Sequence, residues 1–379
     1  MNKEDYTIGY EHKSLSKKIL TAGYIITSTG LILVTISFFS DYLRSSYLSL
    51  VTFAFLFSIG AGAMFLVSLE YLTGAVWSIP FRRVAEFLGS LVFASPLFLI
   101  PVIINREELY ATNNDNVYLY IRLITTFLIW RIFYVLTSKN SRKQDIKGCQ
   151  DMTGKNTVIF AVFVVFLTIA IYVITTDWFN LPNIPTLNTI GGLYIFAGAV
   201  TTSIALWGLI SIILKENGYL INDLSSDNYY GFGALLFAFT VFWGYIVFIQ
   251  FLLVRYANVP QESAWFIRHS TAGWEYFFYG LLFLQLVLPF SLLLTQNAKM
   301  NPNMLKLAAI ILITARFYDL YWLLIPEYSK NGFSFNIFDF TFLLTALGIG
   351  MIVFYFTPKN KNWVPIGDPK LKHALQFKL

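Results

Sequence analysis

The chain carries a few ionisable side chains inside long apolar segments. Arg316 and Asp319 lie three residues apart within the apolar stretch 303–325. This spacing places both on one face of a helix, where they can pair. Arg316 falls near the middle of the stretch, and Asp319 lies about 9 Å from its outer end at 1.5 Å per residue. Charges buried in apolar segments are costly, so the pair indicates either a proton- or quinol-linked role or an ion pair that only fixes helix packing.

Four other ionisable residues lie in or at the ends of apolar segments. Glu70 is followed by Tyr71 rather than by charged residues, and we treat it as a proton-path candidate or a structural acid. Arg131 lies two turns from the inner end of its segment and can extend to the interface. Glu275 is surrounded by aromatic residues and is a candidate for lining an outer cavity. Glu86 follows two arginines, and we interpret it mainly as a first-turn acid favoured by the helix dipole.

Several chemistries are excluded by missing residues. The three histidines (His12, His269 and His373) offer no pair within one apolar segment, so a cytochrome b-like haem site is ruled out. One cysteine, Cys149, cannot form an internal disulfide or hold an iron–sulfur cluster. The nucleotide-binding, zinc-protease and serine-hydrolase motifs are missing as well. The sequence assigns no catalytic residue, no metal site and no redox centre to this chain.

The elements that must position these residues are membrane-spanning helices. Hydrophobic residues make up 56 % of the 379 residues and charged residues only 13 %, against about a quarter charged in soluble domains. The apolar residues fall in blocks near the roughly 20 residues that cross a bilayer. We predict an all-α integral membrane protein with about ten transmembrane helices, at 19–39, 48–71, 84–104, 119–138, 157–176, 189–214, 231–254, 270–295, 303–325 and 337–357.

The basic residues set the predicted orientation. Eighteen Lys and Arg residues fall in the loops and tails on the side of the N-terminus, and five fall on the opposite side. The positive-inside rule therefore predicts that both termini, 1–18 and 358–379, are cytoplasmic tails. The net charge of +6 is explained by this topology, and we expect no nucleic-acid partner.

Four stretches resemble a known family. They are GAGAMFLVSLEYLTGAVWSIPFRRVAEFLG at 60–89, FWGYIVFIQFLLVRYANVPQESAWFIR at 242–268, TARFYDLYWLLIPEY at 314–328 and PIGDPKLKHALQF at 365–377. Together they are similar to the ActF-type membrane subunits of bacterial alternative complex III, related to the NrfD/PsrC family. The likeness covers essentially the whole chain. Its most specific part is the loop after the seventh predicted helix, and the C-terminal tail is next.

The resemblance implies a fold, a membrane and a set of partners. It implies two four-helix bundles, about 48–176 and 189–325, plus outer helices, in the bacterial cytoplasmic (inner) membrane. The implied complex is a respiratory quinol:cytochrome c or oxidase-linked oxidoreductase. Its partners would be a homologous ten-helix, quinol-binding ActC-like subunit, a periplasmic iron–sulfur subunit, multihaem cytochromes c, lipids and a terminal oxidase. Haem c and iron–sulfur clusters would lie in those partners, and binding of menaquinone or ubiquinone by this chain is left open.

The resemblance also assigns roles to residues. Glu70, Arg131, Glu275, Arg316 and Asp319 become candidates for a proton path, which would make the chain a proton-translocating subunit rather than a catalytic one. The outer loop, with Glu262, Trp265 and Arg268, becomes a candidate for docking on the periplasmic subunit; the alternative is an amphipathic connector at the interface.

Two other functions fit the same features. A secondary transporter would also bury charge and break helices near the midplane. A membrane anchor of the complex would use the same charges for structure alone.

Overall fold

The computed structural model describes residues 13–110, 117–147, 151–179, 190–221, 224, 226–329, 331–359 and 361–377. Cys149 lies outside them. Within these ranges all regular structure is helical, and ten helices are long and apolar enough to cross a membrane. The predicted all-α, ten-helix membrane protein is thereby confirmed. Helices are expected there because no water in the hydrocarbon core can satisfy a backbone that does not bond within its own segment.

The first five spans are built from the N-terminal half of the chain. Three of them are continuous single helices, the fifth is a helix that ends in a π-helical turn, and the third span is assembled from several short pieces. The elements are α1 (Lys17–Ser40), α2 (Tyr42–Thr73), η2 (Ile79–Phe81), α3 (Arg82–Leu88), η3 (Gly89–Phe93), η4 (Ser95–Leu99), α4 (Ile100–Ile104), α5 (Arg106–Tyr110), α6 (Val117–Lys147), α7 (Asp151–Ile174) and η5 (Thr175–Phe179).

The last five spans follow the same pattern, with one broken span among longer helices. The elements are α8 (Gly191–Glu216), α9 (Ser226–Ala257), α10 (Pro260–His269), α11 (Trp274–Leu282), η7 (Phe283–Val287), α12 (Leu288–Leu292), α13 (Gln296–Met300), α14 (Pro302–Tyr328), η8 (Ile337–Phe340), α15 (Thr341–Phe356) and α16 (Leu371–Leu375). Several helices outrun the predicted spans. For instance, α6 continues nine residues past 138, because a helix need not stop where its apolar part does.

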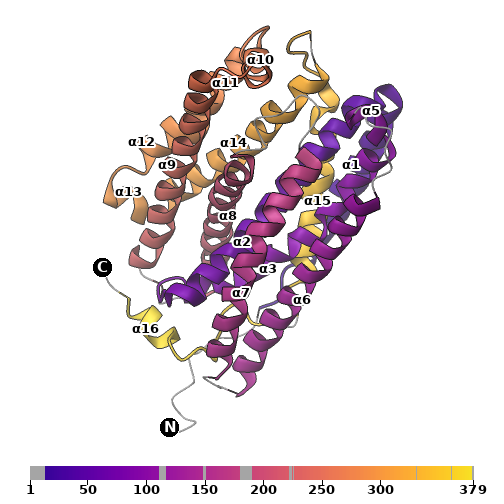
Figure 1. Cartoon of the computed structure of the whole chain (residues 1–379). Helices are drawn as coiled ribbons and strands as arrows, with labels where there is room; N and C mark the ends of the chain where they lie inside the picture. The colour runs from indigo at the N-terminus through magenta and orange to yellow at the C-terminus, as the bar shows by residue number, and fades with distance from the viewer. Residues whose placement is uncertain are drawn as a thin grey trace.

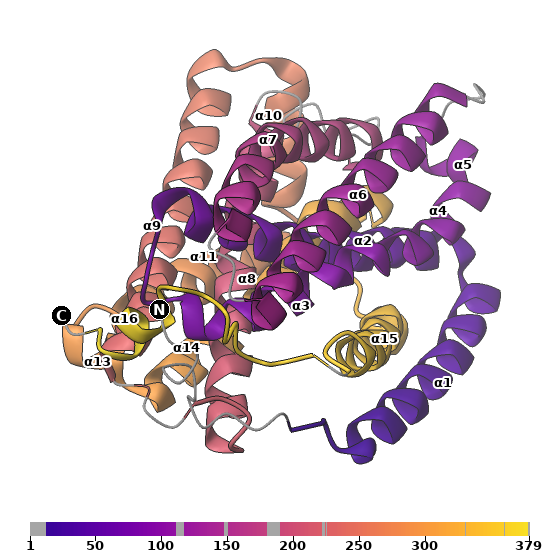
Figure 2. The same cartoon turned by 90° about the horizontal axis from the view of Figure 1, so that it is seen from below.

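The centre of the protein is formed by α2, α8 and α14, which contact one another. Helix α2 is the most enclosed, with 94 % of its most apolar window buried. Around it pack α7, the pieces α3 to α4 and α14, while α9 covers α8 and α6 covers α7. Helices α1 and α15 pack on each other at the edge of the molecule, as the view from below shows (Figure 2).

Prolines lie at the breaks of two of the spans. In the third span, Pro96 and Pro101 each stand at the start of a new helical piece after a 3-10 or irregular turn. In the eighth span a π-helical turn, Phe283–Val287, precedes Pro289. Proline lacks the N–H that would continue the helix, so the bonding pattern changes at each site.

Both chain ends lie at the same end of the molecule, opposite α10 (Figure 1). We call these the tail end and the α10 end. The two tails meet there: the indole N–H of Trp363 donates to the Lys13 carbonyl at 2.9 Å. The C-terminal tail packs on the bundle, where Val364, Leu371 and Ala374 are buried.

Small residues let the central helices approach closely. A Cβ at Gly62 would lie 2.4 Å from the Ala199 carbonyl oxygen and 2.4 Å from Ser203 Oγ, both on α8. Gly60 is just as crowded, by the backbone of Val92. Without a hydrophobic drive between helices, such close packing is a principal source of association in a membrane.

We therefore expect Gly62→Ala to push α2 and α8 apart and to lower the free energy of unfolding by about 1–3 kcal/mol, the usual cost of overpacking. Thermal unfolding of the full chain in detergent measures this. The control is Gly154→Ala on α7, where a Cβ meets nothing within 4 Å and the gain in helix propensity is about 0.5–1 kcal/mol. Equal stability of the two variants would contradict the close-packing argument.

Candidate functional site

Buried charge is arranged at three levels along α2. Arg44 marks the α10 end, Ser58 the middle and Glu70 the tail end. At 1.5 Å per residue, about 21 Å separates the first two levels and about 18 Å the last two. The whole series therefore spans about 39 Å, more than the hydrocarbon core of about 30 Å and close to the full bilayer with its interfacial regions.

The middle level holds Arg316 and Asp319, which we call the central pair. Both are fully buried, and Nη1 of Arg316 lies 2.6 Å from Oδ2 of Asp319. The second guanidinium nitrogen donates to Ser58 Oγ at 3.0 Å and to the Ile195 carbonyl at 3.4 Å. Tyr194 donates its hydroxyl proton to the other carboxylate oxygen. The pair thus links α2, α8 and α14 at the point where the three helices meet.

The guanidinium fits because α8 has no side chain at Gly198. A Cβ there would lie 2.1 Å from Nη1 of Arg316. The central pair has one positive and one negative charge, so its charges balance. Of the polar side-chain atoms of these two residues, Nε of Arg316 alone has no hydrogen-bond partner among the described residues. This arrangement satisfies most of what a buried ion pair requires.

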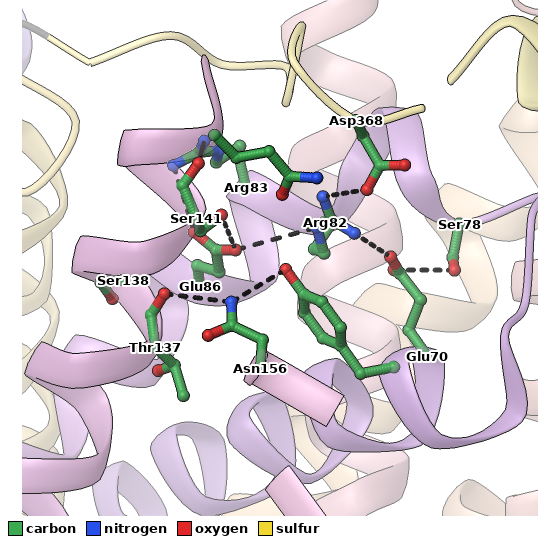
Figure 3. A network of polar contacts seen from close by, with 12 residues as sticks. Glu70, Ser78, Arg82, Arg83, Glu86, Thr137, Ser138, Ser141, Asn156 and Asp368 are labelled. Carbon is green, nitrogen blue, oxygen red and sulfur yellow. Dashed lines mark hydrogen bonds and ion pairs between the residues drawn. The ribbon is translucent and has the colours of Figure 1, made fainter. Parts of the chain in front are cut away.

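The tail end holds a larger network, built around two arginines that begin α3 (Figure 3). Arg82 lies between two carboxylates: Nη1 is 3.0 Å from Glu70 and Nη2 is 2.7 Å from Asp368 of the C-terminal tail. Ser78 donates to the second oxygen of Glu70 at 2.8 Å. The guanidinium carbon stands 4.8 Å from the centre of the Tyr71 ring.

The second arginine extends the network to α6. Arg83 lies 2.6 Å from Asp145 and 3.5 Å from Glu86. Ser141 donates to Glu86 at 2.9 Å, and Arg82 Nε approaches the same carboxylate at 3.8 Å. Glu86 is thus buried between both arginines, which corrects our interpretation of it as mainly a helix-dipole acid. We call the six residues the tail-end cluster: Glu70, Arg82, Arg83, Glu86, Asp145 and Asp368.

The charges of the tail-end cluster do not balance. Four carboxylates face two guanidiniums, and the side chains are at most 10 % exposed. The next cation, Lys361, interacts with Glu86 from outside the cluster. Burying unpaired carboxylate charge is expensive, and binding a proton is the simplest way to remove it.

The tail-end cluster and the central pair are separate. Between Ser58 and Glu70, the only hydroxyl that α2 offers is Ser68, which donates to the Met64 carbonyl at 2.7 Å. The hydrogen bonds of the described residues leave the two groups unconnected, and Leu66 and Val67 are buried in the interval. The described residues therefore provide no direct proton relay along fixed side chains between the two groups.

The α10 end carries a third group. Arg44 binds Asp339 through two nitrogens, at 2.7 and 2.6 Å, and its Nη2 donates to the Ser334 carbonyl at 2.7 Å. Tyr321 of α14 donates to the same carboxylate at 2.8 Å. This bidentate pair ties the start of α2 to the start of the last span.

The outer loop predicted for docking forms a helix, α10. Trp265 is buried and stacks on His269 with ring centroids 4.0 Å apart. Arg268 binds Glu327 of α14 at 2.7 Å, while Glu262 is partly exposed. Trp265 thus packs inside the protein, whereas Glu262 and Arg268 are partly exposed and remain accessible to a partner.

The other candidates lie apart. The Glu275 carboxylate accepts a bond from the Gly273 N–H at 2.8 Å, at the start of its own helix. Arg131 lies at the surface of α6, with its guanidinium 5.0 Å from the Phe93 ring centre. Neither contacts the central pair or the charges of the α10 end, and Arg131 stays outside the hydrogen bonds of the tail-end cluster.

Sequence reasoning missed several residues of these groups. Asp339 lies within a predicted span, so the rule that selected Asp319 would have selected it too. Arg82 and Arg83 were counted only as topology signals, and Asp368 was placed in a tail. No local signal shows that this tail folds back onto Arg82, because the two are 286 residues apart.

No family model matches the chain, and comparison with curated proteins finds no relative.

His269 provides a test of the α10 end. It lies between spans, and burial lowers its pKa to about 3, although its ring nitrogens are 2.9 and 3.4 Å from the Trp265 and Leu323 carbonyl oxygens. Between about pH 3 and 6.5 the unfolded chain therefore binds a proton that the folded chain does not, so stability falls as the pH is lowered through this window.

We expect the change from pH 7.5 to 5.0 to cost the protein about 2 kcal/mol through His269. The variant His269→Phe has no imidazole to protonate, so its free energy of unfolding should fall by about 2 kcal/mol less between the two pH values. The thermal midpoint of both proteins at the two pH values measures it. An equal pH effect on the two proteins would show that His269 is not held neutral.

Proposed function

We propose that the chain is a non-catalytic membrane subunit of a respiratory quinol oxidoreductase complex of the ActF type, and that its buried carboxylates bind and release protons. The observation that carries the proton role is the tail-end cluster, in which three buried carboxylates and the nearly buried Asp145 face two guanidiniums. A proton added to such a cluster removes excess negative charge, and a proton released restores it. This is the property required of a proton-loading site in a membrane.

The central pair would serve as the second station. Asp319 is the one carboxylate near the middle level, and Tyr194 and Arg316 hold it in place. The apolar interval of about 18 Å along α2 means that protons would need water or a rearrangement to pass. Such a change would have to be driven by the partner that handles electrons, because this chain is proposed to hold no redox centre.

The proposed NrfD-like arrangement draws its support from the packing of the helices. The second to fifth spans contact one another around α2 and α7, the sixth to ninth around α8 and α14, and α1 pairs with α15 outside. We propose these as the two bundles and the outer helices of that fold. The bacterial inner membrane, cytoplasmic tails and the ActC-like, iron–sulfur and multihaem cytochrome c partners belong to the same proposal.

Two alternative functions, a secondary transporter and a structural anchor, are each supported by one observation. The third and eighth spans are both broken, and each is the third span of its half of the chain, which would suit a secondary transporter built from two five-span repeats. In the proposed four-span bundles they take the second and the third position instead. The balanced central pair would suit a purely structural anchor, since a one-to-one ion pair can fix helix packing without moving a proton.

The complex can be tested by purifying the tagged chain from its membrane in mild detergent and measuring haem and iron. Stoichiometric multihaem cytochrome c and iron–sulfur protein would support the respiratory assignment. A colourless, solitary protein would contradict it and favour the transporter.

The proton role predicts that Glu70→Gln and Asp319→Asn leave the complex assembled but lower quinol oxidation, or protons moved per electron, by at least about tenfold, or about 1.4 kcal/mol in the limiting step. The matched control is Glu216→Gln, which removes an acid from an exposed ion pair with Lys306. Turnover and proton yield are measured on purified, haem-quantified complex. Normal values in assembled Glu70 and Asp319 variants would favour the structural anchor.

A further inference from the structure

A basic cavity lies between α6 and the end of α15, beside the tail-end cluster. Its volume is about 370 Å³, within the range of ligand sites. Three cations line it, together with four hydroxyl groups and two apolar side chains. The lining residues are Arg131, Arg142, Lys361, Ser90, Tyr134, Ser138, Thr357, Val135 and Phe356.

One face of α6 builds the wall of this cavity. Arg131, Val135, Ser138 and Arg142 follow one another at intervals of four, three and four residues, which places them in one stripe. The stripe runs about 16 Å along the helix at 1.5 Å per residue. Because Arg131, Val135 and Arg142 are exposed, the cavity opens at the outer surface of the bundle.

The three cations of the cavity form no ion pair among the described residues. Arg131 stands over the aromatic rings of Phe93 and Tyr134, and Nε of Arg142 donates to the carbonyl of Ser138 at 3.0 Å. Glu86 and Asp145 of the tail-end cluster are bound to Arg83. Burial lowers the pKa of Lys361, the nearby Arg142 lowers it further, and Glu86 raises it, so the acids of the cluster compensate the cavity only at longer range than an ion pair.

The position of Arg131 adds a second reason to expect an anion. It lies two turns inside the apolar part of α6, on a face that opens to the surroundings of the bundle. An unpaired arginine at that depth is costly in a bilayer. An anionic lipid seated in the cavity would give it ester oxygens as acceptors without water.

We propose that this cavity binds the phosphate ester of an anionic phospholipid. The phosphate would lie between Arg142 and Lys361, accepting bonds from Ser138 and Thr357. Arg131 would face the glycerol region, and the acyl chains would leave along the surface of α6 past Val135. Basic pockets between helices at the cytoplasmic boundary are a known way of holding such headgroups.

The test compares two double variants of the purified full chain. Arg142→Gln with Lys361→Gln removes two lining cations. Lys139→Gln with Lys143→Gln removes two exposed cations from the same helix that do not line the cavity. The net charge falls by two in both. Native mass spectrometry and thermal midpoints are measured with phosphatidylglycerol, with phosphatidylcholine and with inorganic phosphate.

We expect phosphatidylglycerol to bind and stabilise the unaltered chain and the control more strongly than phosphatidylcholine does. The lining variant should lose most of this difference, with affinity weakened roughly 10–30-fold. The single variant Lys361→Gln, a milder change, should lose part of the preference for phosphatidylglycerol over phosphatidylcholine.

An equal preference for phosphatidylglycerol in the lining and control variants would overturn the proposal. Stabilisation by inorganic phosphate alone, lost in the lining variant, would overturn the lipid as the source and assign the site to a free phosphate. These outcomes depend neither on haem nor on proton movement, so they are independent of the proposed respiratory role.

Discussion

A guanidinium buried in the middle of a helical bundle imposes conditions on everything around it. Arg316 needs an anion, further acceptors and empty space at one depth, and three helices must supply them together: Asp319 from its own helix, Ser58 from α2 and a bare backbone at Gly198 on α8. Each helix is thereby fixed in rotation and in height. A shift of one residue in any of them would keep the ion pair, which lies within α14, but would remove the contacts to Ser58 or Tyr194 or the space at Gly198, and buried charge without such hydrogen bonds is expensive in a protein interior.

Helix α2 transmits this constraint to both ends. The same helix presents Arg44 to Asp339 at one end and Glu70 to Arg82 at the other. Its enclosure also explains why small residues are needed where Gly60 and Gly62 face η3 and α8. The three charged levels are therefore held in register by a single rigid element, which suits a protein whose charges must keep fixed depths in a membrane.

Much of the architecture could be predicted because a membrane restricts what a sequence can do. Segment length alone identified ten spans, and the three-residue spacing identified Arg316 and Asp319 as partners. The prediction was weaker where partners are remote in sequence. Ser58, Tyr194 and Asp368 carry no local mark of their contacts, and Trp265 looked available for docking although its ring is buried on His269. Packing between distant segments decided each of these cases.

The contact between Arg82 and Asp368 has a consequence for how the protein is made. A ribosome needs roughly 15–60 s to add the 286 residues between them. Throughout that time the early spans must reside in the bilayer with Arg82 lacking its tail partner. The C-terminal tail then folds over this end of the bundle and brings the fourth acid to a site that began with three. A chain released before Asp368 would thus hold all ten spans, while its tail-end cluster would have three carboxylates against two guanidiniums instead of four.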